Sequence, residues 1–177
     1  WIVRSSGPPG ERTDPIAGVG QVHIAARSFG LNRAEAVTRA GGSGDAVRFP
    51  RVLGIECVGT VVTAPGTTFE PGQTVAAVMG GMGREFDGSY ATDTIVPATH
   101  VIAIDTTLSW TDLAAIPETF LTAWGCLHEA LRIERTSGPR IVVRPGASAL
   151  GRAVTQIVND IGGSVIGVTR SADKADT

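Results

Sequence analysis

Apolar and polar residues alternate over the first hundred positions in short segments that turns interrupt. Every second residue of 21–26 is apolar, which predicts a half-buried strand. A β-branched run over 52–63 contains Gly54 and Gly59, which predicts a strand bent at a barrel corner. Further strands are expected next to Gly- or Pro-containing turns, over residues 73–79, 89–96 and 100–104, with an edge strand and a Pro- and Gly-rich loop in 1–20. This spacing favours a compact antiparallel β-barrel.

Helical periodicity appears in fewer places. Residues 32–39 predict a short helix that two glycines end. Ser109 precedes Asp112 with the spacing of a capping box, so we expect a short helix as far as Ile116. Pro117 suits the first turn of a second helix that reaches Leu131. We place a domain boundary around residue 105, so that these helices bridge a barrel domain at 1–105 and a second domain at 106–177.

The second domain is predicted to contain one βαβ unit. Residues 140–144 predict a strand, 145–151 a turn of small residues, and 164–169 a second strand. The intervening helix, which extends to Ile161, carries an apolar stripe expected to face the sheet: Leu150, Ala153, Val154, Ile157, Val158 and Ile161. A doubly wound sheet has about six strands, so we expect only the start of a dinucleotide-binding domain here.

The small-residue turn has the pattern G-x-S-x-x-G. Small side chains let backbone N–H groups and the positive end of a helix approach a pyrophosphate. We therefore interpret six consecutive residues as cofactor-binding: Gly146, Ala147, Ser148, Ala149, Leu150 and Gly151. The alternative is an ordinary strand–turn–helix joint.

The end of the second strand indicates which dinucleotide would bind. A site selective for NAD has Asp or Glu there. This chain has Thr169, Arg170 and Ser171, followed by Lys174. Two hydroxyls and two cations suit a 2′-phosphate, so we predict NADPH, although Asp173 also allows a solvated charged loop.

Overall charge and cysteine content exclude several classes. A net charge of −2 gives no reason to expect a nucleic acid or an anionic membrane as partner. No apolar run approaches the roughly 18 residues of a membrane span. Cys57 and Cys126 are interpreted as reduced, largely buried thiols of a cytoplasmic protein.

Several motifs follow one another along nearly the whole chain, in residues 29–33, 49–56, 71–75, 86–91, 121–124, 146–151 and 169–171. Taken in order, they resemble the medium-chain dehydrogenase/reductase superfamily, specifically its zinc-independent quinone oxidoreductase-like branch. It implies a fold of the α+β and α/β classes, a GroES-like β-barrel followed by a Rossmann domain, with the active site in the cleft between them. It also leaves a homodimer open, because relatives often dimerise through Rossmann strands.

The resemblance bears on metal binding. Zinc-dependent relatives carry Gly-His-Glu where this chain has Gly54-Ile55-Glu56, and a Cys in the segment that here holds Asn32 and Arg33. A catalytic zinc needs about three protein ligands, and an alkyl side chain cannot serve as one. We therefore expect no metal.

The resemblance also implies that Asn32 and Thr122 lie near the nicotinamide, where Asn32 would orient a carbonyl or the carboxamide. The alternatives are a helix N-cap for Asn32 and an ordinary helical residue for Thr122. Glu56 lies in an apolar strand and is expected to be structural, with a partner such as Arg33. Some relatives hold the nicotinamide with a Tyr at the position of Val37, so no Tyr-assisted proton transfer is expected.

These inferences predict an NADPH-dependent, zinc-independent oxidoreductase that transfers hydride to a small-molecule quinone or to an activated enone or carbonyl. The alternative is a truncated, non-catalytic fragment or interaction module of the same family. Two Rossmann strands alone leave open edges and an uncovered apolar face. We expect these 177 residues by themselves to have weak activity or none.

Overall fold

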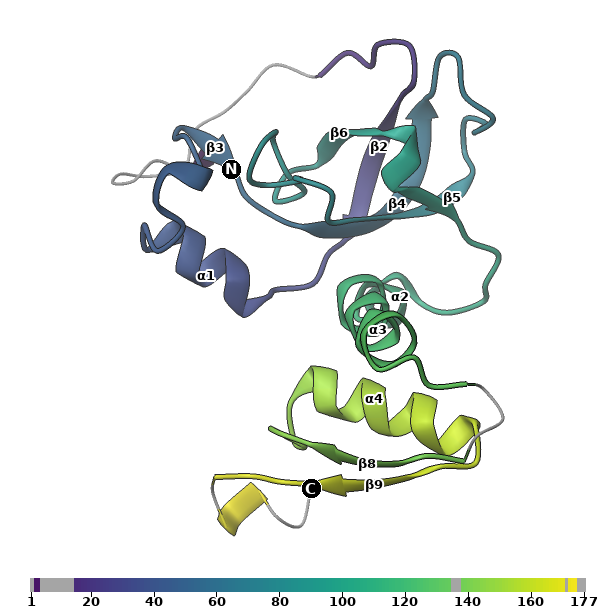
Figure 1. Cartoon of the computed structure of the whole chain (residues 1–177). Coiled ribbons are helices and arrows are strands. Elements are labelled where there is room, and N and C mark those ends of the chain that lie inside the picture. Colours follow the sequence, from purple (N-terminus) through teal and green to yellow (C-terminus); the bar gives the residue numbers. More distant parts are fainter. Residues whose placement is uncertain (1, 4–14, 135–137, 171, 175–177) are drawn as a thin grey trace. The chain divides into compact units, whose positions relative to one another are not determined.

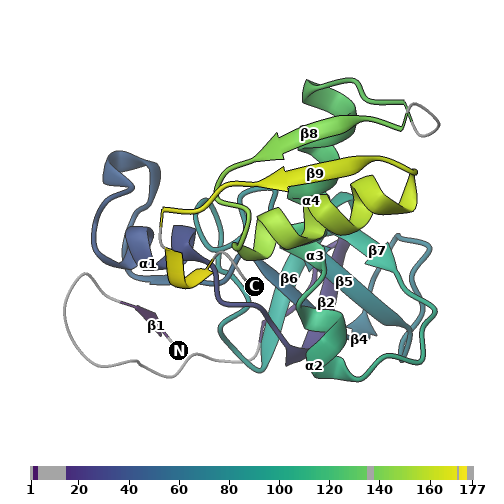
Figure 2. The same ribbon diagram turned by 90° about the horizontal axis from the view of Figure 1, so that it is seen from below.

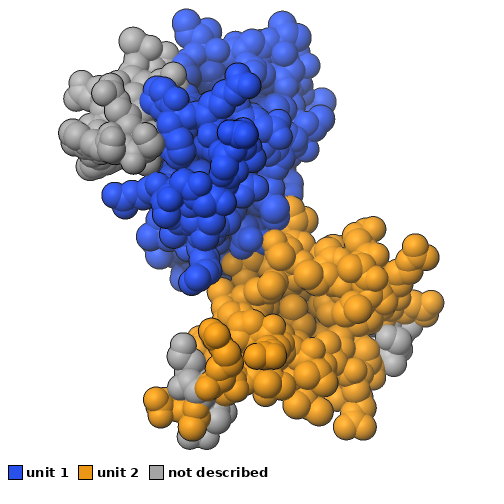
Figure 3. Space-filling view, turned by 60° about the vertical axis from the view of Figure 1, so that its left-hand side comes forward, with its two compact units in different colours: residues 1–118 blue, residues 119–177 orange. Residues whose placement is uncertain are grey.

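We describe the fold from a computed structural model, which covers residues 2–3, 15–134, 138–170 and 172–174 (Figure 1). The chain forms two compact units, Trp1–Glu118 and Thr119–Thr177, which Figure 3 shows in separate colours. The boundary predicted near residue 105 lies earlier in the chain than this division and stays a prediction. Most of the predicted loop in 1–20 lies outside the described residues.

The first unit is built on a five-stranded antiparallel sheet with the order β6-β2-β4-β5-β7. Its strands are β2 (Gln21–Ser28), β4 (Glu56–Thr63), β5 (Thr74–Val78), β6 (Asp93–Pro97) and β7 (Val101–Ala103). The alternation predicted for 21–26 is confirmed, because Val22 and Ile24 are fully buried. One cluster forms the core: Val22, Ile24, Cys57, Val61, Val75, Ala77, Met82, Val96 and Val101. Burial of this apolar surface is the main force that stabilises the first unit.

The strand predicted over 52–63 is interrupted, so the prediction of one bent strand is wrong. It is divided into β3 (Arg51–Val52), which pairs with β1 (Ile2–Val3), and β4. Between them Gly54 has a φ of +104°, a conformation that a side chain disfavours. A Cβ at Gly54 would also lie 2.7 Å from the backbone nitrogens of Ser89 and Tyr90. The backbone around Gly54 therefore lies directly against residues 89–90, at the point where the strand is interrupted.

The first unit also contains two short α-helices, of which α2 packs against the sheet. Helix α1 (Arg33–Arg39) has Asn32 as its N-cap, and helix α2 (Trp110–Ala114) has Ser109. The Ser109 hydroxyl oxygen accepts from the Asp112 N–H at 3.2 Å, as predicted. Leu113 and Ala114 are buried against Val58 and Ala76. Two 3₁₀ turns, η1 (Gly44–Ala46) and η2 (Ala98–His100), complete the described helical segments of this unit.

The second unit contains the predicted βαβ arrangement. Strands β8 (Arg140–Val143) and β9 (Ser164–Gly167) are parallel, and α4 (Ala149–Asp160) covers one face of the pair (Figure 1 and Figure 2). A 3₁₀ turn, η4 (Ala172–Lys174), follows. The core cluster consists of Ala123, Leu127, Ala153, Val154 and Val158. Leu150 was expected in the buried stripe, but it lies in the first turn of α4 and is 36% exposed.

The helix predicted over 117–131 changes type along its length. It begins as α3 (Pro117–Trp124) and continues as a π-helix, η3 (Gly125–Ala130). The His128 ring on this segment lies beside that of Trp124, with centroids 3.9 Å apart. Cys126, expected to be largely buried, is exposed on this π-helix. Among the described residues, no helix combines the length and apolarity needed to cross a membrane.

Candidate active site

Asn32 occupies the turn between β2 and α1, where two buried carboxylates hold it. Its backbone is extended (φ −107°, ψ 149°), as an N-cap residue requires. Its N–H donates to Oε2 of Glu35 at 2.6 Å, and its side-chain Nδ2 donates to Oε1 of Glu56 at 2.9 Å. The capping role that the sequence left as an alternative is therefore confirmed. The same residue also has a side-chain contact across to β4.

Glu35 connects α1 to the chain before β4. It is 4% exposed. Oε1 accepts from the Ile55 N–H at 2.8 Å, and Oε2 accepts from the Tyr90 hydroxyl at 2.6 Å as well as from Asn32. These donors satisfy a carboxylate that would otherwise be costly to bury. The Tyr90 ring packs against Phe29 with centroids 4.8 Å apart.

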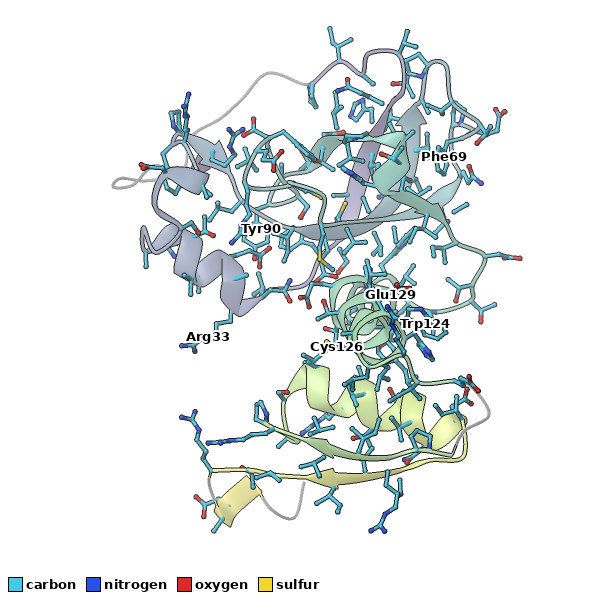
Figure 4. All side chains as sticks on the ribbon, in the orientation of Figure 1. Arg33, Phe69, Tyr90, Trp124, Cys126 and Glu129 are labelled. Atoms are coloured by element: carbon cyan, nitrogen blue, oxygen red, sulfur yellow. The ribbon has the colours of Figure 1, made fainter. Side chains whose placement is uncertain are left out.

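Glu56, the first residue of β4, is 2% exposed. Its Oε2 accepts from the Glu118 N–H at 2.8 Å, so each carboxylate oxygen has its own donor. Its carbonyl oxygen accepts from the hydroxyl of Ser89. Arg33 was expected as its partner, but Arg33 is exposed and points away from the sheet (Figure 4). The expected ionic partner is thus replaced by neutral donors.

The electrostatic environment follows from burial. Burial raises the pKa of Glu56 above 4.5; hydrogen bonds from Asn32 and Glu118 oppose this shift, and the charges of Glu118 and Glu35 add to it. Burial and the neighbouring Glu35 raise the pKa of Tyr90, which keeps its proton. Burial raises the pKa of Cys57 to about 12, so that thiol is unreactive.

Gly30 leaves room for this arrangement. A Cβ at this position would overlap Oε1 of Glu56. The segment from Phe29 to Asn32 can therefore lie directly over the carboxylate only because residue 30 has no side chain. The Leu31 side chain is 80% exposed, so it points to solvent between Gly30 and Asn32.

The predicted dinucleotide turn lies in the second unit and begins α4. A Cβ at Gly146 would lie 2.6 Å from the Cα of Gly167, and one at Gly151 would overlap the carbonyl oxygens of Pro145 and Gly146. The Ser148 hydroxyl accepts from the Gly151 N–H at 3.0 Å and donates to the Pro145 carbonyl at 2.9 Å. Ser148 is therefore the N-cap of α4, and its hydroxyl hydrogen is already used within the turn.

The other predicted residues are distributed as follows. Thr122 lies partly buried on α3, Thr169 and the exposed Arg170 follow β9, and Lys174 closes η4. Ser171 lies outside the described residues. The structure brings Asn32 together with two carboxylates in the first unit, whereas Thr122 and the dinucleotide turn belong to the second. The roles predicted for these residues stay proposals.

Sequence reasoning missed Glu35, Tyr90 and the Glu118 N–H. Glu35 was detectable in principle, because it follows Asn32 at the capping-box spacing. The others had no local signal: Tyr90 is 55 positions from Glu35, and Glu118 is 62 from Glu56. Within the part of the chain that the structure describes, no group of three His, Cys, Asp or Glu side chains is arranged to hold a metal ion.

Comparison with known proteins defines the family. The sequence profile of the alcohol dehydrogenase GroES-like domain matches residues 18–106. The chain therefore belongs to the medium-chain dehydrogenase/reductase superfamily of alcohol dehydrogenase and quinone oxidoreductase-like proteins. The fold predicted for its first unit, a GroES-like domain, is confirmed.

Individual relatives are of several kinds. The chain is 31% identical to the polyketide synthase GfsB of Streptomyces halstedii over 160 residues, 89% of this chain and 3% of the synthase. It is 30% identical to a zinc-type alcohol dehydrogenase-like protein of Schizosaccharomyces pombe, over 86% of this chain and 45% of that protein. A crystal structure of an alcohol dehydrogenase superfamily protein from Novosphingobium aromaticivorans has a TM-score of 0.82 at 26% identity, over 97% of this chain and 53% of that one. The chain thus spans about half or less of these relatives.

Proposed function

We propose that the protein uses NADPH to reduce a quinone or an activated enone or carbonyl, and that it does so without zinc. The observation that carries this proposal is the surroundings of Glu56. Both of its carboxylate oxygens accept hydrogen bonds from N–H groups, and Ile55 occupies the position of the His ligand in zinc-dependent relatives. This set of donors suits orientation of a carbonyl by Asn32 better than it suits a cation.

The turn before α4 fits a dinucleotide. Its close backbone approaches exclude side chains at Gly146 and Gly151, and a twelve-residue helix begins directly after it. Residues 146–151 would hold the pyrophosphate, and Thr169, Arg170, Ser171 and Lys174 would hold the 2′-phosphate. When bound, NADPH supplies the hydride.

The protein's own groups would orient the reactants and control the proton. Asn32 and Thr122 would contact the nicotinamide or the carbonyl. Tyr90 is a poor acid for this step, because its pKa is raised and its hydroxyl is bound to Glu35. We therefore assign the proton to solvent water.

A second candidate function narrows the substrate to an enoyl thioester. Polyketide synthases recur among the relatives, such as GfsB and the compactin diketide synthase mlcB of Penicillium citrinum, and the chain covers only 3% and 5% of them. In that case this chain would belong to the enoyl-reducing segment of a larger synthase. Enones and enoyl thioesters both accept hydride at the β-carbon, so the two candidates share one mechanism.

We further propose that the protein acts in the cytoplasm on a small molecule, with no nucleic acid or membrane as partner, either alone or as a homodimer. Both cysteines are free, and the net charge is −2, which supports this proposal.

The test is a spectrophotometric assay of the full-length protein. A benzoquinone and an enoyl thioester are each tested with NADPH or NADH, and an alcohol is tested with NADP⁺ or NAD⁺. We expect NADPH oxidation with the quinone or the thioester. Replacement R170E should weaken NADPH binding by roughly tenfold through lost charge-assisted bonds and leave NADH unaffected. The matched control is R152Q, an exposed arginine on α4. Absence of NADPH binding would contradict the proposal, and turnover of the alcohol alone would replace it.

A further inference from the structure

The Glu56 carboxylate joins two segments that are distant in sequence. Oε1 accepts from the side chain of Asn32 at 2.9 Å, and Oε2 accepts from the N–H of Glu118 at 2.8 Å. The Asn32 contact spans 24 positions and the Glu118 contact spans 62. Because the side chain is only 2% exposed, water cannot readily replace either donor. The carboxylate is therefore confined to the orientation in which both donors are satisfied.

Asn32 is held at its backbone as well as at its side chain. Glu35 accepts from its N–H and is itself bound to the N–H of Ile55, the residue before Glu56. Two carboxylates thus tie Asn32 to the same point of the sheet. A primary amide has two N–H hydrogens. With one of them directed at Glu56, the direction of the other is set by the plane of the amide.

The second oxygen of Glu56 binds the first turn of α3. Glu118 follows Pro117 at the start of this eight-residue helix. A negative charge at a helix N-terminus interacts favourably with the helix dipole and accepts from an N–H that has no partner within the helix. The Glu56 side chain thus binds both the turn before α1 and the first turn of α3.

We propose that Glu56 is a positioning residue: it fixes the side-chain amide of Asn32 for contact with the nicotinamide or substrate carbonyl and holds it in register with the N-terminus of α3. This inference rests on the proposed function, in which Asn32 makes that contact. A carboxylate is required because both of its oxygens accept hydrogen bonds, whereas an amide of the same shape has one acceptor and one donor.

The kinetic test uses the isosteric replacement E56Q in the full-length protein. The amide introduced by this change can satisfy only one of the two donors, so we expect kcat to fall about 10- to 100-fold while NADPH affinity is retained. N32A should lose a similar factor, and the double variant E56Q/N32A should lose no more than N32A alone, because both changes remove one interaction. The control is E70Q, at an exposed glutamate of the same unit. Unchanged kcat in E56Q, or losses that multiply in the double variant, would overturn the proposal.

A second measurement does not depend on turnover. Nuclear magnetic resonance of the Asn32 side-chain amide should show one hydrogen that exchanges slowly in the wild-type protein and rapidly in E56A, which leaves that hydrogen without its acceptor. If the protein reduces no substrate with NADPH, the proposed function fails, and this measurement then decides only whether Glu56 fixes the Asn32 amide. Rapid exchange in the wild type, or equal protection in E56A, would overturn that fixation. If E56A does not fold, slow exchange in the wild type supports the fixation and rapid exchange overturns it.

Discussion

At the scale of single residues, the site depends on buried carboxylates that are satisfied by N–H and O–H donors. Glu35 accepts three hydrogen bonds, and Glu56 accepts two at its side chain. A buried charge with incomplete partners costs several kcal/mol, which explains why so many contacts converge on these two residues. Gly30 leaves room for Glu56, and Asn32 donates one hydrogen bond to each carboxylate.

The ionisation of Glu56 should make stability depend on pH. Its pKa is raised above 4.5 in the folded state, so its contribution is fully present below the unfolded value and is lost as pH rises through the folded value. The E56Q variant has no carboxyl group at this position, so its stability does not change through this titration. We expect the free energy of unfolding of the wild type to decline relative to E56Q as pH rises above 4.5. Denaturant unfolding of both proteins across that range measures the difference, and a relative gain by the wild type would contradict it.

A side chain at residue 30 should destabilise the protein. G30A would force a methyl group into Oε1 of Glu56 and should destabilise the first unit by about 1–3 kcal/mol. G125A is the matched control, because nothing lies within 4 Å of a Cβ at that position. Thermal unfolding should separate the two variants. Equal melting temperatures would show that the carboxylate moves aside at little cost.

The two cysteines should differ in reactivity. Cys57 is buried and its pKa is raised to about 12, whereas Cys126 on the π-helix is exposed. An aromatic disulfide reagent should therefore modify one thiol in the native protein and two after unfolding. C126S should abolish the native reaction, and C57S should leave it intact. Native modification of Cys57 would mean that the core of the first unit opens.

At the scale of elements, several of the candidate site residues lie at the N-termini of helices. Asn32, Ser109 and Ser148 are N-caps, and the first turn of α3 binds Glu56. The capping pattern of Ser109 and the turn pattern of Ser148 were both recognisable from local spacing. The π-helix after Trp124 was not recognisable, because no local spacing in the sequence distinguishes a π turn from an α turn.

Ser148 should contribute to stability independently of any cofactor. Its hydroxyl caps α4 through the Gly151 N–H, so S148A should cost about 1 kcal/mol, and S148G only a few tenths. Denaturant unfolding of the second unit, without cofactor, measures this effect. Loss of NADPH binding without loss of stability would instead assign the hydroxyl directly to the cofactor.

At the scale of the whole molecule, the second unit exposes the sheet face opposite α4. Val142 and Ile166 are paired neighbours on β8 and β9 and are 66% and 55% exposed, whereas Ile141 and Val143 pack on the α4 side. Parallel strands are normally covered on both faces. The alternative of an interaction module draws its support from this exposed apolar face.

Polar replacement of this face tests that alternative. V142T/I166T should reduce binding of a hydrophobic dye and self-association of the 177-residue chain, with a stability change within about 1 kcal/mol, since little buried surface is lost. I141T, on the face that packs against α4, should destabilise the unit instead. Light scattering of the three proteins at matched concentration compares them. Unchanged association in the double variant would exclude the face as its cause.

The sequence alone determined most strands of the first unit, the βαβ unit, the Ser109 cap and the family, because periodicity, turn residues and ordered motifs are local properties of a chain. Only the tertiary structure decided what surrounds Glu56. Its donors come from 24 and 62 positions away, and Arg33, the expected ionic partner, is exposed. Hydrogen-bond partners of a buried group depend on which distant backbone atoms the fold brings within about 3 Å. No local pattern encodes that selection, so the contact between Asn32 and Glu56 became known only from the structure.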